Sequence, residues 1–357
     1  MRLNQLLVNL AFVSNKPTGI TTYANNLIPH LQKLQPTFLS AGQIDNCACY
    51  PVAANLTPDS GSKGHLRRIF WTQFQLPQIY KQLRSHLLFS PIPEAPLFAN
   101  CRYIVTVHDL IPLRFARRSP LTLYSRYYVP QVLAQAQHII CNSTATASDI
   151  TRFYGIAASK ITPILLAHDA LNFRLLNLPK QNYFLYIGRQ DPYKNLQRVI
   201  AAFAAIPNCR DYQLWIAGSF DARYTPTLQA LIDNLGIKEQ VKFLDYVPYN
   251  QLPIIINSAI ALVFPSLWEG FGFPVLEAMA CGTPVITSNI SSLPEVAQDA
   301  ALLVDPYNTE EISAAMQEIA SSQEMRSHLS KLGLIRASQF SWEKTGSATV
   351  EVLSRYL

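Results

Sequence analysis

The second half of the chain alternates short apolar runs with amphipathic segments, and this rhythm restricts the possible folds more than any other feature. Apolar runs typical of buried strands occur at residues 183–187, 213–217, 241–244, 260–264, 284–287 and 301–304. Segments with helical periodicity lie at about 195–205, 225–235, 248–257, 274–281 and 309–320. Strands and helices that alternate in this way form parallel sheets covered on both faces. The pattern therefore predicts a doubly wound α/β domain.

The first half shows the same rhythm less cleanly. Residues 3–8 are expected to form a strand, a turn with Gly19 precedes a helix, and residues 37–62 are expected to be irregular. A chain of 357 residues is too long for one ordinary core, so we expect two domains. The polar, proline-containing stretch 171–181 is the expected linker. The expected divisions are a first domain over 1–175, a second over 176–340, and an amphipathic helix over 341–357 that packs back on the first.

The composition excludes several classes of protein. Hydrophobic residues make up 49% and charged residues 15% of the chain, which is typical of a globular protein and not of a disordered one. No apolar run reaches the length of a membrane span. Residues 1–10 contain too many polar side chains for a secretory signal. The six cysteines are scattered, which favours reduced thiols and a cytoplasmic location.

The net charge of +6 is unevenly distributed. Residues 1–178 hold 16 Lys or Arg and 6 Asp or Glu, whereas residues 179–357 hold 13 and 17. The basic first half is expected to meet something anionic, either nucleic acid, a membrane surface or a phosphate-bearing lipid, unless the charge only solubilises the surface. The basic and aromatic segments 63–86 and 114–118 are the candidate contacts with an anionic membrane.

A glycine-rich unit follows the apolar run that ends at Phe264. Its loop contains Gly272, and Pro274 is expected at the first position of a short helix, where its missing N–H costs nothing. Free backbone N–H groups at such a helix start bind anions, typically phosphate. Glu269 and Glu277 bracket the loop, and carboxylates in this position suit the hydroxyls of a sugar or ribose. Taken singly, each acid could equally be an exposed loop acid or a first-turn helix acid.

A second loop follows the expected strand 183–187. It carries Arg189 and Lys194, and both cations could reach one diphosphate, Arg through its fork and Lys as a point charge. Asn195 is expected to cap the next helix. The alternative is a solvated loop with a capping turn. The chain contains no Asp-x-Asp pair, so no metal site for a diphosphate is expected and the charge would be met by these cations.

In the first half, His108 and Asp109 close a buried strand. A histidine at a strand end can donate or accept a proton near neutral pH, although a core histidine bonded to backbone is the alternative.

These motifs together resemble a known family. The stretch Glu269-Gly-Phe-Gly-Phe-Pro-Val-Leu-Glu277 is similar to the Glu-x7-Glu motif of the retaining family 4 (group 1) glycosyltransferases of the GT-B fold. The loop Tyr186-Ile-Gly-Arg-Gln-Asp-Pro-Tyr-Lys-Asn195 resembles their phosphate loop. The stretch 107–113 resembles the His-Asp segment of the mannosyltransferase-like branch, and 18–23 its N-terminal glycine loop. The family often has two adjacent glycines in that loop, where this chain has one.

The resemblance implies two Rossmann-like domains facing across a cleft and a site for a nucleotide-diphosphate sugar on the second. Arg189 and Lys194 would hold the diphosphate, and Glu277 would bind the ribose hydroxyls. Val247 lies where the family contacts the nucleotide base. No cofactor or metal is implied, because the nucleotide sugar, GDP-mannose or a UDP-sugar, is a substrate.

The same resemblance implies groups around the transferred sugar. Glu269, with the backbone N–H groups of Phe271 and Gly272, would bind its hydroxyls. His108 would line the catalytic centre, and Gly19 would let the first loop approach sugar and acceptor.

The expected function is therefore retaining transfer of a sugar, mannose being favoured, to a hydroxyl of a growing glycan, polysaccharide or lipid-linked saccharide. The expected partners are a nucleotide sugar and a saccharide or lipid-linked acceptor, with no nucleic acid. The expected location is the cytoplasm, with the inner face of the cytoplasmic membrane as a further option. The alternatives are a nucleotide-sugar epimerase of the same fold and a non-catalytic partner subunit. A glycosidase is disfavoured, because its two carboxylates should face one another across the sugar at ~5–10 Å.

Overall fold

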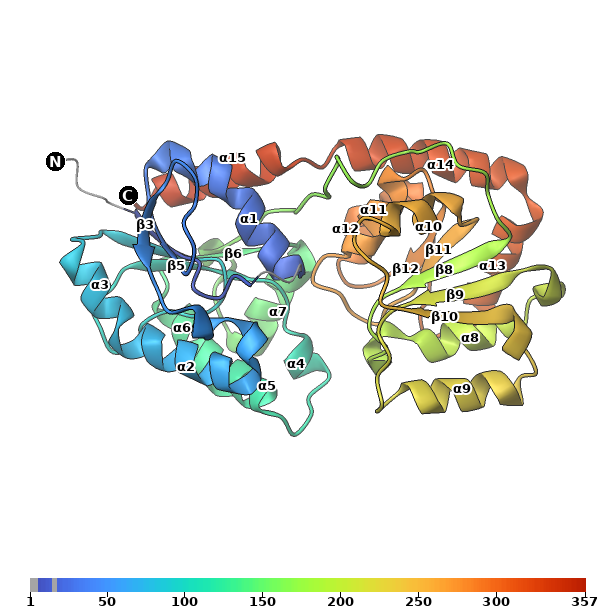
Figure 1. Cartoon of the computed structure of the whole chain (residues 1–357), viewed down its shortest axis with the longest axis horizontal. Coiled ribbons are helices and arrows are strands. Elements are labelled where there is room, and N and C mark those ends of the chain that lie inside the picture. Colours follow the sequence, from blue (N-terminus) through green and yellow to red (C-terminus); the bar gives the residue numbers. More distant parts are fainter. Residues whose placement is uncertain (1–5, 15–17) are drawn as a thin grey trace. The chain divides into compact units, whose positions relative to one another are not determined.

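A computed structural model describes residues 6–14 and 18–357 of the chain. Residues 3–5 of the expected first strand, and Lys16 and Pro17 of the expected turn, lie outside the described residues. The chain divides into two compact units: unit 1 is Met1–Leu166 with Trp342–Leu357, and unit 2 is Ala167–Ser341. In each unit, helices cover both faces of one parallel sheet (Figure 1). Among the described residues, no helix is both long and apolar enough to cross a bilayer.

The sheet of unit 1 is entirely parallel and has the order β3-β2-β1-β4-β5-β6-β7. Its strands are β1 (Leu6–Asn9), β2 (Thr37–Ser40), β3 (Ala48–Pro51), β4 (Leu87–Ser90), β5 (Tyr103–Val107), β6 (His138–Cys141) and β7 (Ile161–Pro163). The expectation that residues 37–62 are irregular was wrong, because β2, β3 and the start of a helix lie within them. β2 pairs with β1 and buries Phe38 and Leu39.

The helices of unit 1 are α1 (Gly19–Leu31), α2 (Gly61–Phe74), α3 (Leu76–Gln82), α4 (Ile111–Arg114), α5 (Pro120–Leu123), α6 (Val129–Gln135), α7 (Thr144–Tyr154) and α15 (Trp342–Ser354), with one π-helical turn, η4 (Tyr124–Tyr128). The chain thus returns to unit 1 with its last helix. α15 packs closely on α1, because a Cβ at Gly346 would lie 2.1 Å from the ring of His30. The hydroxyl of Thr345 also donates a hydrogen bond to the Leu165 carbonyl at 2.8 Å.

The sheet of unit 2 confirms the rhythm expected from the sequence. Its strands are β8 (Tyr183–Ile187), β9 (Gln213–Ala217), β10 (Val241–Asp245), β11 (Ala261–Phe264), β12 (Val285–Ser288) and β13 (Leu302–Val304). They are all parallel, in the order β10-β9-β8-β11-β12-β13. The direction of winding therefore reverses between β8 and β11. In such sheets, ligands bind beyond the carboxyl ends of the strands at this switch point.

The helices of unit 2 are α8 (Leu196–Ala204), α9 (Thr225–Asn234), α10 (Leu252–Ser258), α11 (Phe273–Ala280), α12 (Leu293–Ala297), α13 (Thr309–Ser321) and α14 (Gln323–Ser338). The expected linker, residues 171–181, belongs to this unit. It is held against α10, because the backbone N–H of Leu176 and the Lys180 ammonium both donate to Asn257.

Candidate functional site

The loops after β8 and β11 meet at the switch point of unit 2. The first loop carries Lys194 and the second carries Glu269. Their side chains form an ion pair in which Nζ lies 2.6 Å from Oε1. Because β8 and β11 are neighbours in the sheet, this contact joins residues that lie 75 positions apart in the sequence. The two motifs singled out from the sequence therefore form one site.

The Lys194–Glu269 pair is shielded from solvent. The exposed fractions of the two side chains are 14% and 10%. The ammonium also lies 5.2 Å from the ring centroid of Phe264 and 5.5 Å from that of Tyr193. A charge in such surroundings interacts more strongly with a bound ion than it would in water. The pair places one cation and one acid, each able to hydrogen-bond a ligand, at the same point of the sheet edge.

Arg189 lies on the same loop and is largely exposed, with 76% of its side chain open to solvent. Its guanidinium donates to the Tyr193 hydroxyl at 2.8 Å and lies 3.3 Å from the Asp191 carboxylate. The Tyr186 hydroxyl donates to the Arg189 carbonyl and so fixes the backbone below it. Arg189 is thus a second cation, held by residues of its own loop, and its guanidinium group remains accessible to solvent.

The glycine-rich loop adopts a conformation that a side chain would disturb. Gly272 has φ of 113° and precedes α11. A Cβ there would lie 2.6 Å from Leu293 of α12. The Ser292 hydroxyl is within hydrogen-bond distance of the carbonyls of Glu269 and Phe271, at 3.0 and 2.8 Å. These contacts hold Glu269 and the start of α11 in place. Phe271, whose backbone N–H was expected to face the sugar, has a buried side chain.

Glu277 lies one turn into α11 and is partly buried. Burial, and secondly the nearby charge of Asp169, raise its pKa to about 8. Asp169 in turn accepts a hydrogen bond from the Tyr249 hydroxyl at 3.3 Å. Tyr249 follows β10, as does Val247, which is half-buried in the loop between β10 and α10. A neutral carboxyl of this kind can both donate and accept hydrogen bonds.

In this region the structure gives Asn195 a different role from the expected one, and it adds two residues, Gly218 and Tyr249, that the sequence did not single out. Asn195 precedes α8 but makes no side-chain capping bond, because its φ is 66°. Its amide instead donates to the carbonyls of Pro265 and Pro306, which ties the loops after β8, β11 and β13 together. Gly218 was missed, although a Cβ there would lie 2.0 Å from the Gly188 carbonyl oxygen. The sequence feature that could have identified Gly218 is a glycine directly after an apolar run. No comparable sequence feature marks Tyr249.

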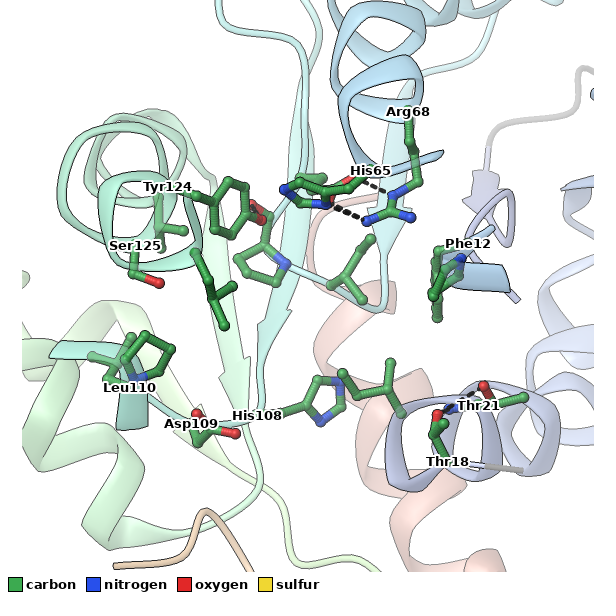
Figure 2. Close-up of a pocket in the computed structure, with 18 residues that line it drawn as sticks. Phe12, Thr18, Thr21, His65, Arg68, His108, Asp109, Leu110, Tyr124 and Ser125 are labelled. Atoms are coloured by element: carbon green, nitrogen blue, oxygen red, sulfur yellow. Dashed lines mark hydrogen bonds and ion pairs between the residues drawn. The ribbon is translucent and has the colours of Figure 1, made fainter. Parts of the chain in front are cut away.

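His108 and Gly19, the other expected site residues, belong to unit 1. His108 follows β5, and its Nε2 lies 2.8 Å from the Pro91 carbonyl. A carbonyl only accepts, so Nε2 carries the proton. Burial lowers the pKa of His108 to about 4, so the ring is neutral near pH 7. Gly19 is the first residue of α1, which Thr18 caps by accepting from Thr21 N–H. Figure 2 shows His108, Thr18 and Thr21 around one cavity.

Comparison with known proteins identifies one family of enzymes. The model of the glycosyl transferases group 1 matches residues 169–334, and the model of glycosyltransferase family 4 matches residues 17–169. The chain is 31% identical to O-antigen chain mannosyltransferase B of Escherichia coli over 264 residues, which are 70% of this chain and 69% of that one. It is 26% identical to O-antigen chain mannosyltransferase RfbU of Salmonella typhimurium over 88% of this chain and 90% of that one.

Solved structures of similar fold cover both units. Sucrose-phosphate synthase from Thermosynechococcus elongatus superposes with a TM-score of 0.79 at 20% identity, covering 98% of each chain. Anabaena HepE, solved with UDP and glucose, superposes with a TM-score of 0.75 at 18% identity, covering 98% of this chain and 99% of that one. The matched family models and the sequence similarity show that the chain belongs to the group 1, family 4 glycosyltransferases.

Proposed function

We propose that this glycosyltransferase moves a sugar, mannose being favoured, from a nucleotide-diphosphate sugar, GDP-mannose or a UDP-sugar, to a saccharide hydroxyl, without a metal and with retention of configuration. The acceptor would be a growing glycan, polysaccharide or lipid-linked saccharide. The observation that carries the proposal is the Lys194–Glu269 ion pair at the switch point of unit 2, a cation for phosphate beside an acid for hydroxyls. Mannose is favoured because two relatives carry the name O-antigen mannosyltransferase.

The chemistry we assign to these residues is electrostatic. Lys194 gives up part of its contact with Glu269 and, with Arg189, stabilises the negative charge that grows on the leaving diphosphate. Glu269 then turns its free oxygens to hydroxyls of the transferred sugar. The acceptor hydroxyl attacks from the face that the diphosphate leaves, and a diphosphate oxygen takes its proton. The remaining rate acceleration would come from the positioning of the two substrates.

Glu277 is assigned to the ribose. With a pKa of about 8, its carboxyl is mostly protonated near pH 7 in the free protein. Such a group can donate to one ribose hydroxyl and accept from the next.

The first test offers the purified protein a panel of nucleotide sugars, each with and without EDTA. Slow hydrolysis, thermal stabilisation and transfer to mannosides are followed, and the anomeric configuration of the product is read by NMR. We expect the protein to use one nucleotide sugar, at the same rate with and without EDTA. Lys194→Ala and Glu277→Ala should each sharply reduce its use. Isomerisation of the sugar without an acceptor would instead identify an epimerase, and near-normal transfer by both variants would refute the site assignment.

Contact with an anionic membrane is a further part of the proposal. Leu66, Phe70 and Phe74 recur every four residues on α2 and are exposed, and Arg67 lies exposed among them. Such a stripe can enter the interface while the cation meets lipid phosphate. Flotation with anionic and neutral liposomes at low salt tests this. Phe70→Ser with Phe74→Ser should abolish binding to anionic liposomes, whereas Leu171→Ser, an exposed apolar residue of unit 2, should not. If the unaltered protein does not bind anionic liposomes, the proposed membrane contact is refuted.

A further inference from the structure

The lysine of the candidate site has too few contacts of its own to fix the position of its charge. Among the described residues, the Lys194 ammonium makes one hydrogen bond, to Glu269, and otherwise lies near two aromatic rings. A lysine side chain has a flexible stem of four carbons, and holding such a chain in one geometry costs conformational entropy. The position of the ammonium therefore depends on how firmly the backbone of Lys194 is held.

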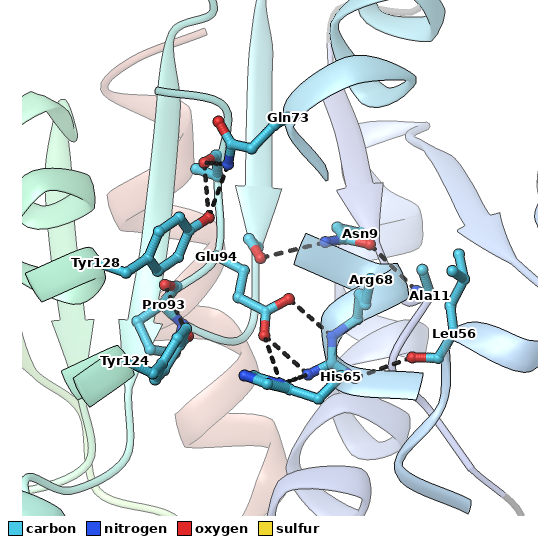
Figure 3. A network of polar contacts seen from close by, with 12 residues as sticks. Asn9, Ala11, Leu56, His65, Arg68, Gln73, Pro93, Glu94, Tyr124 and Tyr128 are labelled. Carbon is cyan, nitrogen blue, oxygen red and sulfur yellow. Dashed lines mark hydrogen bonds and ion pairs between the residues drawn. The ribbon is translucent and has the colours of Figure 1, made fainter. Parts of the chain in front are cut away.

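The shielded cation of unit 1 shows the other possible arrangement, in which the side chain itself is fixed. The Arg68 guanidinium donates to both carboxylate oxygens of Glu94, at 2.7 and 2.8 Å, and to the Leu56 carbonyl at 2.9 Å (Figure 3). A fourth hydrogen bond joins Nη2 to His65 Nδ1 at 2.9 Å. A planar guanidinium with these contacts is fixed by its own hydrogen bonds. Lys194 has only one such bond, so its neighbours in the chain must position it.

Both neighbours of Lys194 in the chain are tied to the loop after β11. The Tyr193 carbonyl accepts a hydrogen bond from the backbone N–H of Leu267 at 2.7 Å. On the other side, the side-chain amide of Asn195 donates to the Pro265 carbonyl at 2.9 Å. Lys194 therefore lies between two links to the loop that carries its partner carboxylate. One link is a backbone bond, which most substitutions preserve, and the other depends on a single side chain.

The Asn195 amide makes its hydrogen bonds inside the protein. Its second N–H donates to the Pro306 carbonyl, in the loop after β13, at 2.6 Å. Its Oδ1 accepts from the Arg198 guanidinium at 2.8 Å. Because a carbonyl only accepts and an arginine only donates, these partners determine which end of the amide is the nitrogen. Asn195 is 2% exposed, so its amide serves the protein and not a ligand.

The backbone at this position restricts which residue can make these bonds. Asn195 has φ of 66° and ψ of 21°, in the left-handed region. Glycine, asparagine and aspartate adopt this region at the least cost. Glycine would supply no donor, and aspartate would place a carboxylate against two carbonyls. Of the residues that suit the backbone, asparagine alone supplies two donors.

We propose that Asn195 is a positioning residue that holds the Lys194 ammonium in place for the diphosphate of the donor. The inference rests on the proposed use of a nucleotide-diphosphate sugar, since it names what keeps Lys194 in position when its contact with Glu269 is partly given up. Asn195 itself touches no substrate. Without its amide, the turn Pro192–Lys194 can shift relative to the loop after β11, and the ammonium shifts with it.

The test is a double-mutant cycle on the affinity for GDP and UDP, the diphosphates that the proposed donors would release. Calorimetric titration of the full-length protein measures this affinity. Asn195→Gly removes the amide but keeps a residue that adopts positive φ. It is made in the unaltered protein and in Lys194→Met, so that any coupling between the two positions is measured directly. Asn177→Gly is the matched control, because Asn177 also has positive φ, of 51°, but is exposed.

Arg198→Met provides a second and milder variant. It removes the guanidinium that orients the Asn195 amide and leaves both amide donors in place. It is made in the same two backgrounds, and thermal unfolding of every variant shows whether it is folded. If Asn195→Gly does not fold, the cycle with Arg198→Met decides the question in the same way.

Asn195→Gly should weaken nucleotide binding by about tenfold, the loss expected when one hydrogen bond to a charged group is impaired. In the Lys194→Met protein the same change should have less than about a twofold effect, because the ammonium that Asn195 positions is absent. Arg198→Met should weaken binding by about threefold, and again only where Lys194 is present. Asn177→Gly should bind like the unaltered protein.

Equal losses with and without Lys194 would show that Asn195 supports the fold in general, and would overturn the inference. Unchanged binding by a folded Asn195→Gly protein would overturn it as well. In both cases the loss of affinity caused by Lys194→Met alone would still support the proposed donor site. If neither nucleotide binds the unaltered protein, the proposed function itself is refuted, and this inference with it.

Discussion

Replacing Glu277 by glutamine should change how the stability of the protein depends on pH. The pKa of Glu277 in the folded chain is about 8, against an ordinary value of 4.5. The folded state therefore holds this proton more tightly than the unfolded state does. The resulting stability is fully present below pH 4.5 and is lost as pH rises towards 8. Glutamine has no proton to lose, so Glu277→Gln should escape that loss.

The size of the effect follows from the pKa difference. A difference of one in pKa corresponds to about 1.4 kcal/mol. Between about pH 5 and about pH 9, the full pKa difference would lower the unfolding free energy of the unaltered protein by at most roughly 4 kcal/mol. Glu277 is only partly buried, and water reduces the cost. We therefore expect the unfolding free energy of Glu277→Gln, relative to that of the unaltered protein, to rise by about 2 kcal/mol over this range.

The assay is calorimetric or denaturant unfolding of both proteins across this pH range, without nucleotide. Glu239→Gln, an exposed acid of unit 2, is the matched control and should follow the unaltered protein at every pH. Parallel stability profiles for Glu277→Gln and the unaltered protein would show that Glu277 ionises normally, and would refute the reasoning from burial.

Three further predictions concern packing and charge. Lys194→Met should cost about 3 kcal/mol, because it leaves Glu269 unpaired, and adding Glu269→Gln should restore stability, but not transfer, in thermal unfolding and activity assays. Gly218→Ala should lower the unfolding free energy by about 2 kcal/mol, because its Cβ would meet a backbone carbonyl; an unchanged melting temperature would contradict this. Glu94→Gln should cost about 3 kcal/mol, because it leaves the charge of Arg68 uncompensated, whereas the double variant with Arg68→Met should recover most of it in the same melts.

The sheet of unit 2 could be predicted closely because its central strands are buried on both faces. Such strands are continuous apolar runs, which periodicity detects. Unit 1 was harder to predict at its edge. β3 is a half-exposed edge strand, and the stretch that contains it reads as polar and irregular. Its pairing with β2 is a tertiary contact that composition does not reveal. The polar helix α14 was missed for a similar reason, because its buried residues are few.

The charged groups of the site could be predicted, but their pairing could not. Lys194 and Glu269 each stood out beside an expected strand end. That they contact one another depends on the strand order, which places β8 beside β11. The role of Asn195 was mistaken because helix-cap preference is local, whereas its acceptors are carbonyls from distant loops. Tyr249 likewise acquires its place beside Asp169 only through the fold.

The two units hold their shielded cations in different ways. In unit 2 the cation lies on the loop after β8, whereas in unit 1 it lies on α2, which follows the edge strand β3. In unit 2 the cation at this position is a lysine with one carboxylate contact, and a largely exposed arginine stands beside it. In unit 1 the cation is an arginine held by a carboxylate, a carbonyl and an imidazole. An anion can compete for the first arrangement but not for the second.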